Sequence, residues 1–142
     1  MKPTEKSLMV LIAGPYRSGT HDHPGRMAEN LRLLEQYALP LYRAGHLPMI
    51  GEWVALPIIR EAGSVIVGDP VYQEHLYPVA SRLLERCDAV LRIPGESQGA
   101  DQDVEIARRR GLPIFYKVED VPSAPQKDLE AKELGYGSRE LC

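Results

Sequence analysis

A strand, a glycine-containing turn and a helix follow one another within residues 88–113, and this order constrains the fold more than any other feature of the chain. The apolar run Ala89–Ile93 is typical of a buried strand that ends at Pro94-Gly95. After a short loop, residues 101–110 begin with acidic side chains and end with three arginines, the charge order that a helix dipole favours. In an open α/β sheet such a junction lies at the carboxyl end of a strand, where helix-start amide groups hold anions and ligands bind.

The rest of the sequence repeats this alternation of strand and helix. Apolar runs predict strands at 8–13, 46–50 and 114–118, and apolar residues at helical spacing predict helices at 27–44 and 69–87. Residues 57–67 are apolar but interrupted by glycine, and we interpret them as a helix-plus-loop insertion; residues 128–134 form a further candidate helix. Because helix-length segments separate the strands, the sequence predicts a doubly wound α/β fold, Rossmann-like or flavodoxin-like, with a mostly parallel sheet of four or five strands.

The composition is that of an ordinary globular protein. We expect one domain over residues 1–142, with flexible tails at 1–6 and 135–142. A net charge of -3 and a hydrophobic fraction of 44% give no basic surplus for nucleic acid or for a membrane surface, so we expect a small-molecule or protein partner. No apolar stretch is long enough for a membrane span or a signal sequence, and two cysteines make no disulfide framework, so we expect a cytoplasmic protein.

Glycines and polar side chains gather where the first and third predicted strands end. They are Gly14, Tyr16, Arg17, Ser18 and Gly19 after the first strand, and Ser97 and Gly99 after the third. If these two strands are neighbours, both loops face one crevice. Glycine amide groups and an arginine beside a helix start suit a phosphate or carboxylate ligand. An ordinary surface loop is the alternative interpretation of residues 14–20.

Four carboxylates lie in or near the same region: Asp88, Asp101, Asp103 and Glu105. A carboxylate at such a crevice suits nucleophilic or acid–base chemistry at a sugar carbon. The alternative is that these acids cap the helix and compensate its dipole.

Histidine and tryptophan add two further observations. His21-Asp22-His23 lacks the additional ligands that a closed metal site requires, so no metal is predicted. Trp53, the single tryptophan, follows the second predicted strand, where it either stacks on a ligand base or fills a subunit contact.

The pattern of these segments resembles the nucleoside 2-deoxyribosyltransferase-like family, including its nucleotide N-glycosidase branch. The resemblance covers residues 8–116 and rests on four points. They are a strand ending Gly14-Pro15-Tyr16, a helix containing Asn30, Cys87-Asp88-Ala89-Val90 opening a strand, and Ser97-Gln98-Gly99-Ala100 ahead of an acidic helix start.

The resemblance implies a glutamate nucleophile at that helix start, but this sequence departs from the pattern. The family's spacing, four residues after Gly99 and ten before Pro113, reaches Asp103, whereas the nearest glutamate is Glu105. Helical periodicity does not choose between these acids, because they flank the buried stripe on opposite sides. An aspartate is one methylene shorter, and a displacement of about 1 Å in a reacting group costs on the order of a hundredfold in rate. The sequence therefore leaves open a slow enzyme or a protein that binds without turnover.

By this resemblance we expect cleavage or exchange of the N-glycosidic bond of a (deoxy)nucleoside or nucleoside 5'-monophosphate, without metal or organic cofactor. Asp103 or Glu105 would be the nucleophile, Asp88 would orient the sugar or handle the proton of the leaving base, and Tyr16 would position the nucleophile. The expected substrate-binding residues are Gly14, Arg17, Ser18, Gly19, Asn30, Trp53, Ser97 and Gly99, of which Arg17, Ser18, Ser97 and Gly99 would hold any 5'-phosphate. The alternatives are an inactive nucleotide-binding module and a purely structural interaction protein.

We also expect a homo-oligomer whose crevice is closed by a neighbouring subunit. An open α/β domain leaves its crevice shallow, although the expected chemistry requires limited access of water. The segments suited to cover it are the Trp53 region, the insertion at 58–67 and the tail around Tyr136. The alternative is that the insertion folds back as a lid on its own chain.

Overall fold

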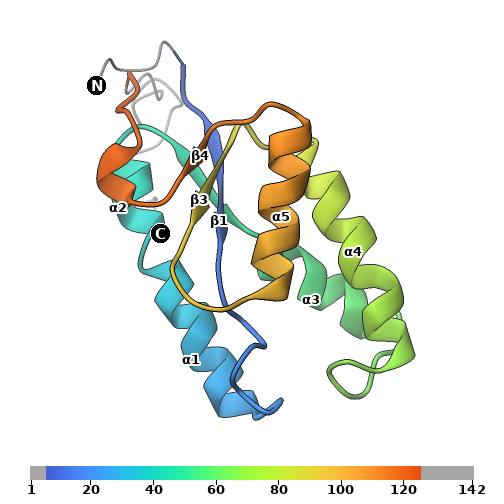
Figure 1. The fold of residues 1–142 in the computed structure, drawn as a ribbon. Helices are drawn as coiled ribbons and strands as arrows, with labels where there is room; N and C mark the ends of the chain where they lie inside the picture. Colours follow the sequence, from blue (N-terminus) through green and yellow to red (C-terminus); the bar gives the residue numbers. More distant parts are fainter. Residues whose placement is uncertain (1–5, 126–142) are drawn as a thin grey trace, which may run out of the picture.

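A computed structural model describes residues 6–125 and contains a four-stranded parallel sheet between two layers of helices (Figure 1). The strands are β1 (Met9–Ala13), β2 (Leu47–Ile50), β3 (Ala89–Arg92) and β4 (Ile114–Phe115), and they lie in the order β2-β1-β3-β4. All pairings between them are parallel. The doubly wound α/β fold predicted from the sequence is confirmed. The tail at 135–142, the candidate helix at 128–134 and most of the tail at 1–6 lie outside the described residues.

Helices cover both faces of the sheet. Figure 1 shows α1 (Pro24–Glu35) and α2 (Ala38–Arg43) on the left of the sheet and α4 (Pro70–Leu84) and α5 (Gln98–Arg109) on the right, with α3 (Gly51–Glu61) beside α4. Alternate residues of β1 supply the two cores: Val10 and Ile12 pack with α1 and α2, whereas Leu11 and Ala13 pack with α4 and α5. Burial on both faces explains why β1 and β3 have continuous apolar sequences.

The order of the strands creates a switch point between β1 and β3. The chain leaves β1 toward α1 and β2 on one side, and it leaves β3 toward α5 and β4 on the other. The register Val10↔Ala89 to Ala13↔Arg92 makes the two strands direct neighbours, so the expectation that their loops share one edge is confirmed. At such a switch point the two loops diverge and leave a crevice at the carboxyl ends of the strands.

Two predicted helices differ from those observed. The helix predicted at 27–44 is two helices, because Pro40 has no N–H to donate to the carbonyl of Gln36, where α1 ends. The helix predicted at 101–110 begins earlier, at Gln98, because the Ser97 hydroxyl accepts the Ala100 N–H at 3.1 Å and caps the first turn.

The edges of the sheet also differ from the prediction. The strand predicted at 114–118 is only Ile114–Phe115, and a 3₁₀ turn, η1 (Val118–Asp120), follows it. The two residues of β4 pair with Val90 and Leu91 of β3. His46 is buried before β2 and joins neighbouring segments, since its Nδ1 accepts the Leu8 N–H at 3.1 Å and its Nε2 lies 2.6 Å from the Pro122 carbonyl.

Candidate functional site

A cavity of about 440 Å³ opens at the carboxyl ends of β1 and β3, at the lower end of the fold in Figure 1. Its walls are the loop after β1, the first turns of α3 and α5, and one side of α4. The polar side chains that line it are those of Tyr16, Arg17, Ser18, Asp22, Glu52, Tyr72, Gln73, Tyr77, Ser97, Gln98, Gln102 and Asp103. Its volume lies in the range of small-molecule sites.

Asp103 projects from α5 into this cavity. Burial raises the pKa of its carboxyl to about 7, against the opposing effect of the positive charge of Arg92. Glu105 does not line the cavity; its side chain is 56% exposed and pairs with Arg109 at 3.3 Å on the outer face of the same helix. The tertiary structure thus distinguishes the two acids that helical periodicity left equivalent, and only Asp103 faces the site.

Glu52 is a further carboxyl group in the cavity, besides Asp103 and the more exposed Asp22, and it is not among the residues predicted from the sequence. It lies in the first turn of α3, which begins directly after β2 without a connecting loop. Burial raises the pKa of Glu52 to about 7, and the charge of Asp103 adds to the rise. The available signal was its position, since an acid immediately after a predicted strand lies at the same edge as the other ligand-binding loops.

Two tyrosines lie close enough to Glu52 to respond to its charge. The pKa of Tyr16 is raised by burial first and by Glu52 second. Tyr72, on α4, is 3% exposed, and the same two causes raise its pKa to about 12. Asn30 does not line the cavity, but its side-chain amide donates to the Tyr16 carbonyl at 2.9 Å and holds the loop after β1 in place. From the sequence α4 shows only an apolar stripe, and no role is predicted for Tyr72.

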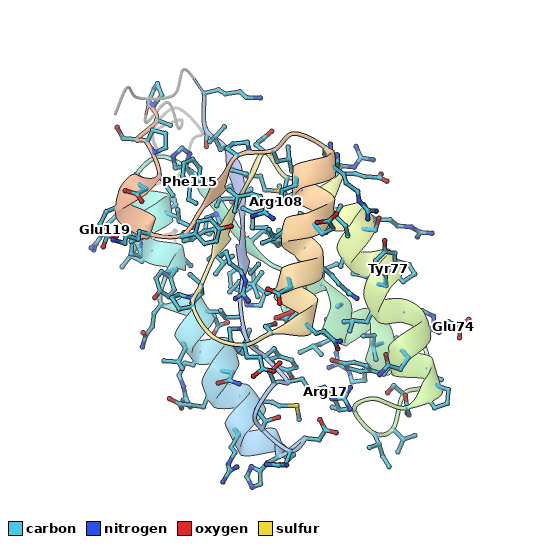
Figure 2. All side chains as sticks on the ribbon, in the orientation of Figure 1. Arg17, Glu74, Tyr77, Arg108, Phe115 and Glu119 are labelled. Atoms are coloured by element: carbon cyan, nitrogen blue, oxygen red, sulfur yellow. The ribbon has the colours of Figure 1, made fainter. Side chains whose placement is uncertain are left out.

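Arg17 is engaged with an acid from its own loop. Its Nε and Nη2 donate to the two carboxylate oxygens of Asp22 at 2.6 and 3.0 Å, and its guanidinium lies 5.7 Å from the centre of the Tyr72 ring. Figure 2 shows Arg17 between the loop after β1 and the loop that leads to α4, where it meets the backbone of Gly68. Ser18 lines the cavity beside it, whereas Gly19 forms a turn with φ of 73° and does not.

The predicted glycines have different roles. A Cβ on Gly14 would come within 2.7 Å of Leu34 Cδ2 and 3.0 Å of Ile93 Cβ, so glycine at this position allows close packing of strand and helix. A Cβ on Gly99 would meet no atom within 4 Å, although Gly99 lines the cavity. Both glycines line the cavity: Gly99 leaves space at the start of α5, whereas Gly14 also allows the end of β1 to pack closely against Leu34 and Ile93.

Two predicted residues are not brought to the cavity. Asp88 precedes β3 and so lies at the amino edge of the sheet, where its Oδ2 accepts the Met9 N–H at 2.9 Å and Lys6 lies 3.8 Å away. In a parallel sheet that edge is opposite the carboxyl ends that form the site. Trp53 points away from the cavity, and its Nε1 donates to Glu35 at 2.8 Å. Neither residue is in a position to contact a ligand in the cavity.

The helix-plus-loop insertion predicted at 57–67 comprises the last residues of α3 and most of the loop that joins α3 to α4. Val67 packs against the small cluster of Ala55, Ile59 and Tyr72, while Asp69 caps α4 by accepting the Tyr72 N–H at 2.9 Å. The tip of the loop is apolar and faces solvent, with Val65 89% and Ile66 68% exposed. The insertion therefore folds against its own chain at one end and leaves an uncovered tip.

Within residues 6–125, no group of three or more His, Cys, Asp or Glu side chains is arranged to hold a metal ion. His23 caps α1 through its Nδ1, which accepts the Arg26 N–H at 3.4 Å. None of the helices in the described part is both long and apolar enough to cross a membrane.

A scan of protein-family models found no match to this chain, and searches of curated proteins and of solved structures found none either. The resemblance drawn from the sequence therefore stays a prediction, and the chemistry of the site must be argued from its own residues.

The two glycines give a matched pair of variants. We expect Gly14→Ala to destabilise the fold by about 1–3 kcal/mol, because its methyl group overpacks the buried Leu34 and Ile93 side chains. Gly99→Ala should leave stability unchanged or raise it by up to about 1 kcal/mol, since the added methyl group meets only open space in a helix. Urea unfolding followed by Trp53 fluorescence measures both. Equal destabilisation by the two changes would contradict the packing described.

The raised pKa of Asp103 predicts a pH-dependent gain in stability for Asp103→Asn. The native carboxyl retains its proton up to about pH 7, whereas the unfolded one loses it near its ordinary value of 3.8, so ionisation costs the native state stability as pH rises between these values. Asparagine avoids that cost. We expect Asp103→Asn to be more stable than the wild type by about 1–3 kcal/mol at pH 8, with the difference disappearing near pH 4.

Urea titrations at pH 4, 6 and 8 measure this effect. Glu105→Gln is the matched control, because it removes an exposed carboxylate from the same helix and should change stability by less than about 0.5 kcal/mol. A constant difference between Asp103→Asn and the wild type at all three pH values would contradict a desolvated carboxyl.

Proposed function

We propose that this protein cleaves or exchanges the N-glycosidic bond of a (deoxy)nucleoside or nucleoside 5'-monophosphate, with Asp103 as nucleophile and Glu52 as general acid and base. The observation that carries the proposal is that both carboxyl groups line one cavity and both have a pKa of about 7. Pairs of carboxyl groups with tuned pKa values are the usual machinery for breaking bonds at an anomeric carbon.

The electrostatics favour this division of roles. The repulsion between the two carboxylates acts on both alike, but Arg92 stabilises the charged form of Asp103, whereas burial is the largest effect on Glu52 and favours its protonated form. When the pair holds one proton, that proton therefore resides on Glu52, which leaves Asp103 as the carboxylate. Arg92 is fixed for this effect, because it also donates to Asp101 at 2.9 Å and to the Gly95 carbonyl at 3.0 Å.

In the first step an Asp103 carboxylate oxygen forms a bond to the anomeric carbon while the bond from that carbon to the base nitrogen breaks. The bonding electron pair leaves with the base, and the Glu52 carboxyl donates its proton to the departing base. The products of this step are the neutral base and a glycosyl ester on Asp103. Tyr16 and Tyr72 line the same cavity as Glu52.

The second step releases the sugar. The Glu52 carboxylate takes a proton from a water molecule, whose oxygen attacks the anomeric carbon and displaces the Asp103 carboxylate. A second base in place of water gives exchange instead of hydrolysis. Both outcomes restore protonated Glu52 and ionised Asp103, and retention of configuration follows from the two displacements.

Release of free base tests the proposal. We expect chromatography to detect base from at least one member of a panel of nucleosides and 5'-monophosphates. We expect Asp103→Asn to lower that rate on the order of 10⁴-fold, because it removes the nucleophile. Glu52→Gln should lower it on the order of 10² to 10⁴-fold, because an amide cannot transfer the proton.

Glu105→Gln and Asp88→Asn separate this assignment from the one suggested by the sequence, since neither residue lies in the cavity. A large loss of rate in either variant, with Glu52→Gln active, would transfer the proposed roles to the residues named by the resemblance. Ligand binding without any base release would support the second candidate, an inactive nucleotide-binding module, which the shorter Asp103 side chain favours.

We further propose that a neighbouring subunit covers the cavity, as the resemblance implies. The exposed apolar tip formed by Val65 and Ile66 supports this, because it belongs to a loop that also borders Arg17 at the cavity. We expect light scattering coupled to size-exclusion chromatography to give a mass of at least two chains at micromolar concentration. A single-chain mass, with activity independent of dilution, would rule the shared site out.

A further inference from the structure

The charges that line the cavity bear on which of the two proposed substrate classes it accepts, nucleosides or nucleoside 5'-monophosphates. Arg17 is the one cationic side chain among the described residues that line it, and the lining acids are Asp22, Glu52 and Asp103. A nucleoside 5'-monophosphate carries a phosphate group that is close to a dianion at neutral pH. Amide groups at the start of α5 offer only partial positive charge, so balancing the charge of the phosphate takes a cation that is free to pair with it.

The charge of Arg17 is already compensated, because Asp22 occupies the donor fork formed by its Nε and Nη2. Both carboxylate oxygens of Asp22 accept from the guanidinium, at 2.6 and 3.0 Å, which is the bidentate geometry that a phosphate would otherwise use. Asp22 has a lowered pKa, with the hydrogen bond from Arg17 as the largest cause, so it remains ionised at neutral pH. The pair has no net charge to offer a ligand.

The loop is shaped to maintain this pairing. His21 and Asp22 both adopt left-handed backbone conformations, with φ of 50° and 58°, which non-glycine residues seldom do. The Thr20 hydroxyl fixes the turn, since it donates to the Arg17 carbonyl and accepts the Asp22 N–H at 3.2 Å. Strained conformations of this kind persist where the surrounding structure requires them. Here the strain brings Asp22 onto Arg17.

The other groups expected to hold a phosphate do not replace Arg17. Ser18, Ser97 and Gly99 line the cavity but carry no charge, and the Ser97 hydroxyl already accepts the Ala100 N–H. Arg92 does not line the cavity and is bound to Asp101 and to backbone carbonyls. Two carboxyl groups, Glu52 and Asp103, line the remaining space. A phosphate in this cavity would therefore lose its hydration without gaining an unpaired cation.

We propose that Asp22 is a specificity-determining residue, which neutralises Arg17 so that the cavity accepts unphosphorylated nucleosides and rejects their 5'-monophosphates. This inference rests on the proposed function and narrows it from two substrate classes to one. Asp22 acts through Arg17 and takes no part in breaking the glycosidic bond.

The test compares four 2'-deoxynucleosides with their 5'-monophosphates at pH 7.5. Calorimetric titration gives the dissociation constant of each compound. For a compound from which base is released, the values of kcat/KM are compared instead. For the best-bound base, we expect the wild type to prefer the nucleoside at least about tenfold, and Asp22→Asn to reduce that preference by about tenfold, since a hydrogen bond to a charged group is worth roughly that much or more.

Two further variants keep the result interpretable. Asn and Gly both adopt the left-handed conformation at low cost, so Asp22→Gly repeats the loss of charge in a second form that fits the turn. Glu29→Gln is the matched control, because it breaks an exposed pair with Arg32 outside the cavity and changes the net charge of the protein equally. Its nucleoside preference should equal that of the wild type.

The outcomes separate this inference from the proposed function. Equal or tighter binding of the monophosphate by the wild type, or an unchanged preference in both Asp22 variants, overturns the inference and leaves glycosidic cleavage standing. A nucleoside preference that depends on Asp22 without release of base supports the inference and removes the enzymatic function. Failure of all eight compounds to bind overturns both.

Discussion

The parallel pairing of β1 with β3 is the interaction on which the rest of the structure depends. Backbone hydrogen bonds at both ends of the pair, from Asp88 N–H to Met9 and from Ile93 N–H to Ala13, each 2.8 Å long, set its register. This register brings the loops after the two strands together, and a Cβ on Gly95 would come within 2.7 Å of Pro15. After β1 and after β3 the chain turns in opposite directions. The two loops therefore diverge, and the cavity lies in the crevice between them.

Desolvation is the main cause of the raised pKa values of the two carboxyl groups, Glu52 and Asp103, that the cavity buries. The two residues come from helices that follow different strands. Low local polarity strengthens the interaction of the two groups with each other and with Arg92. Glu105, on the outer face of the helix that carries Asp103, is exposed instead and pairs with Arg109. The proximity of Glu52 and Asp103 in one enclosed space makes proton transfer near neutral pH possible.

The sequence predicted most of the fold, because periodicity and turn residues are local properties. The strands and the capped start of α4 at Asp69 follow from short segments read alone. The neighbouring positions of β1 and β3 were only a condition of the predicted crevice, and the pairing in the sheet meets it. The boundaries were less predictable. Pro40 divides one expected helix into two, and the Ser97 cap extends another. Both residues are visible in the sequence. In each case, however, the apolar pattern continues across the boundary and obscures it.

The candidate site could be predicted only in part. By itself the sequence determined that Tyr16, Arg17, Ser18, Ser97, Gly99 and Asp103 share one edge of a parallel sheet, because each follows a strand that ends there. The tertiary structure decided which side chains enter the cavity: it admitted Glu52, left Glu105 and Trp53 outside, and held Asp88 at the opposite edge. The physical reason is that burial, pKa and the pairing of Arg17 with Asp22 depend on how separate elements pack in three dimensions, and no periodicity along one segment encodes that arrangement.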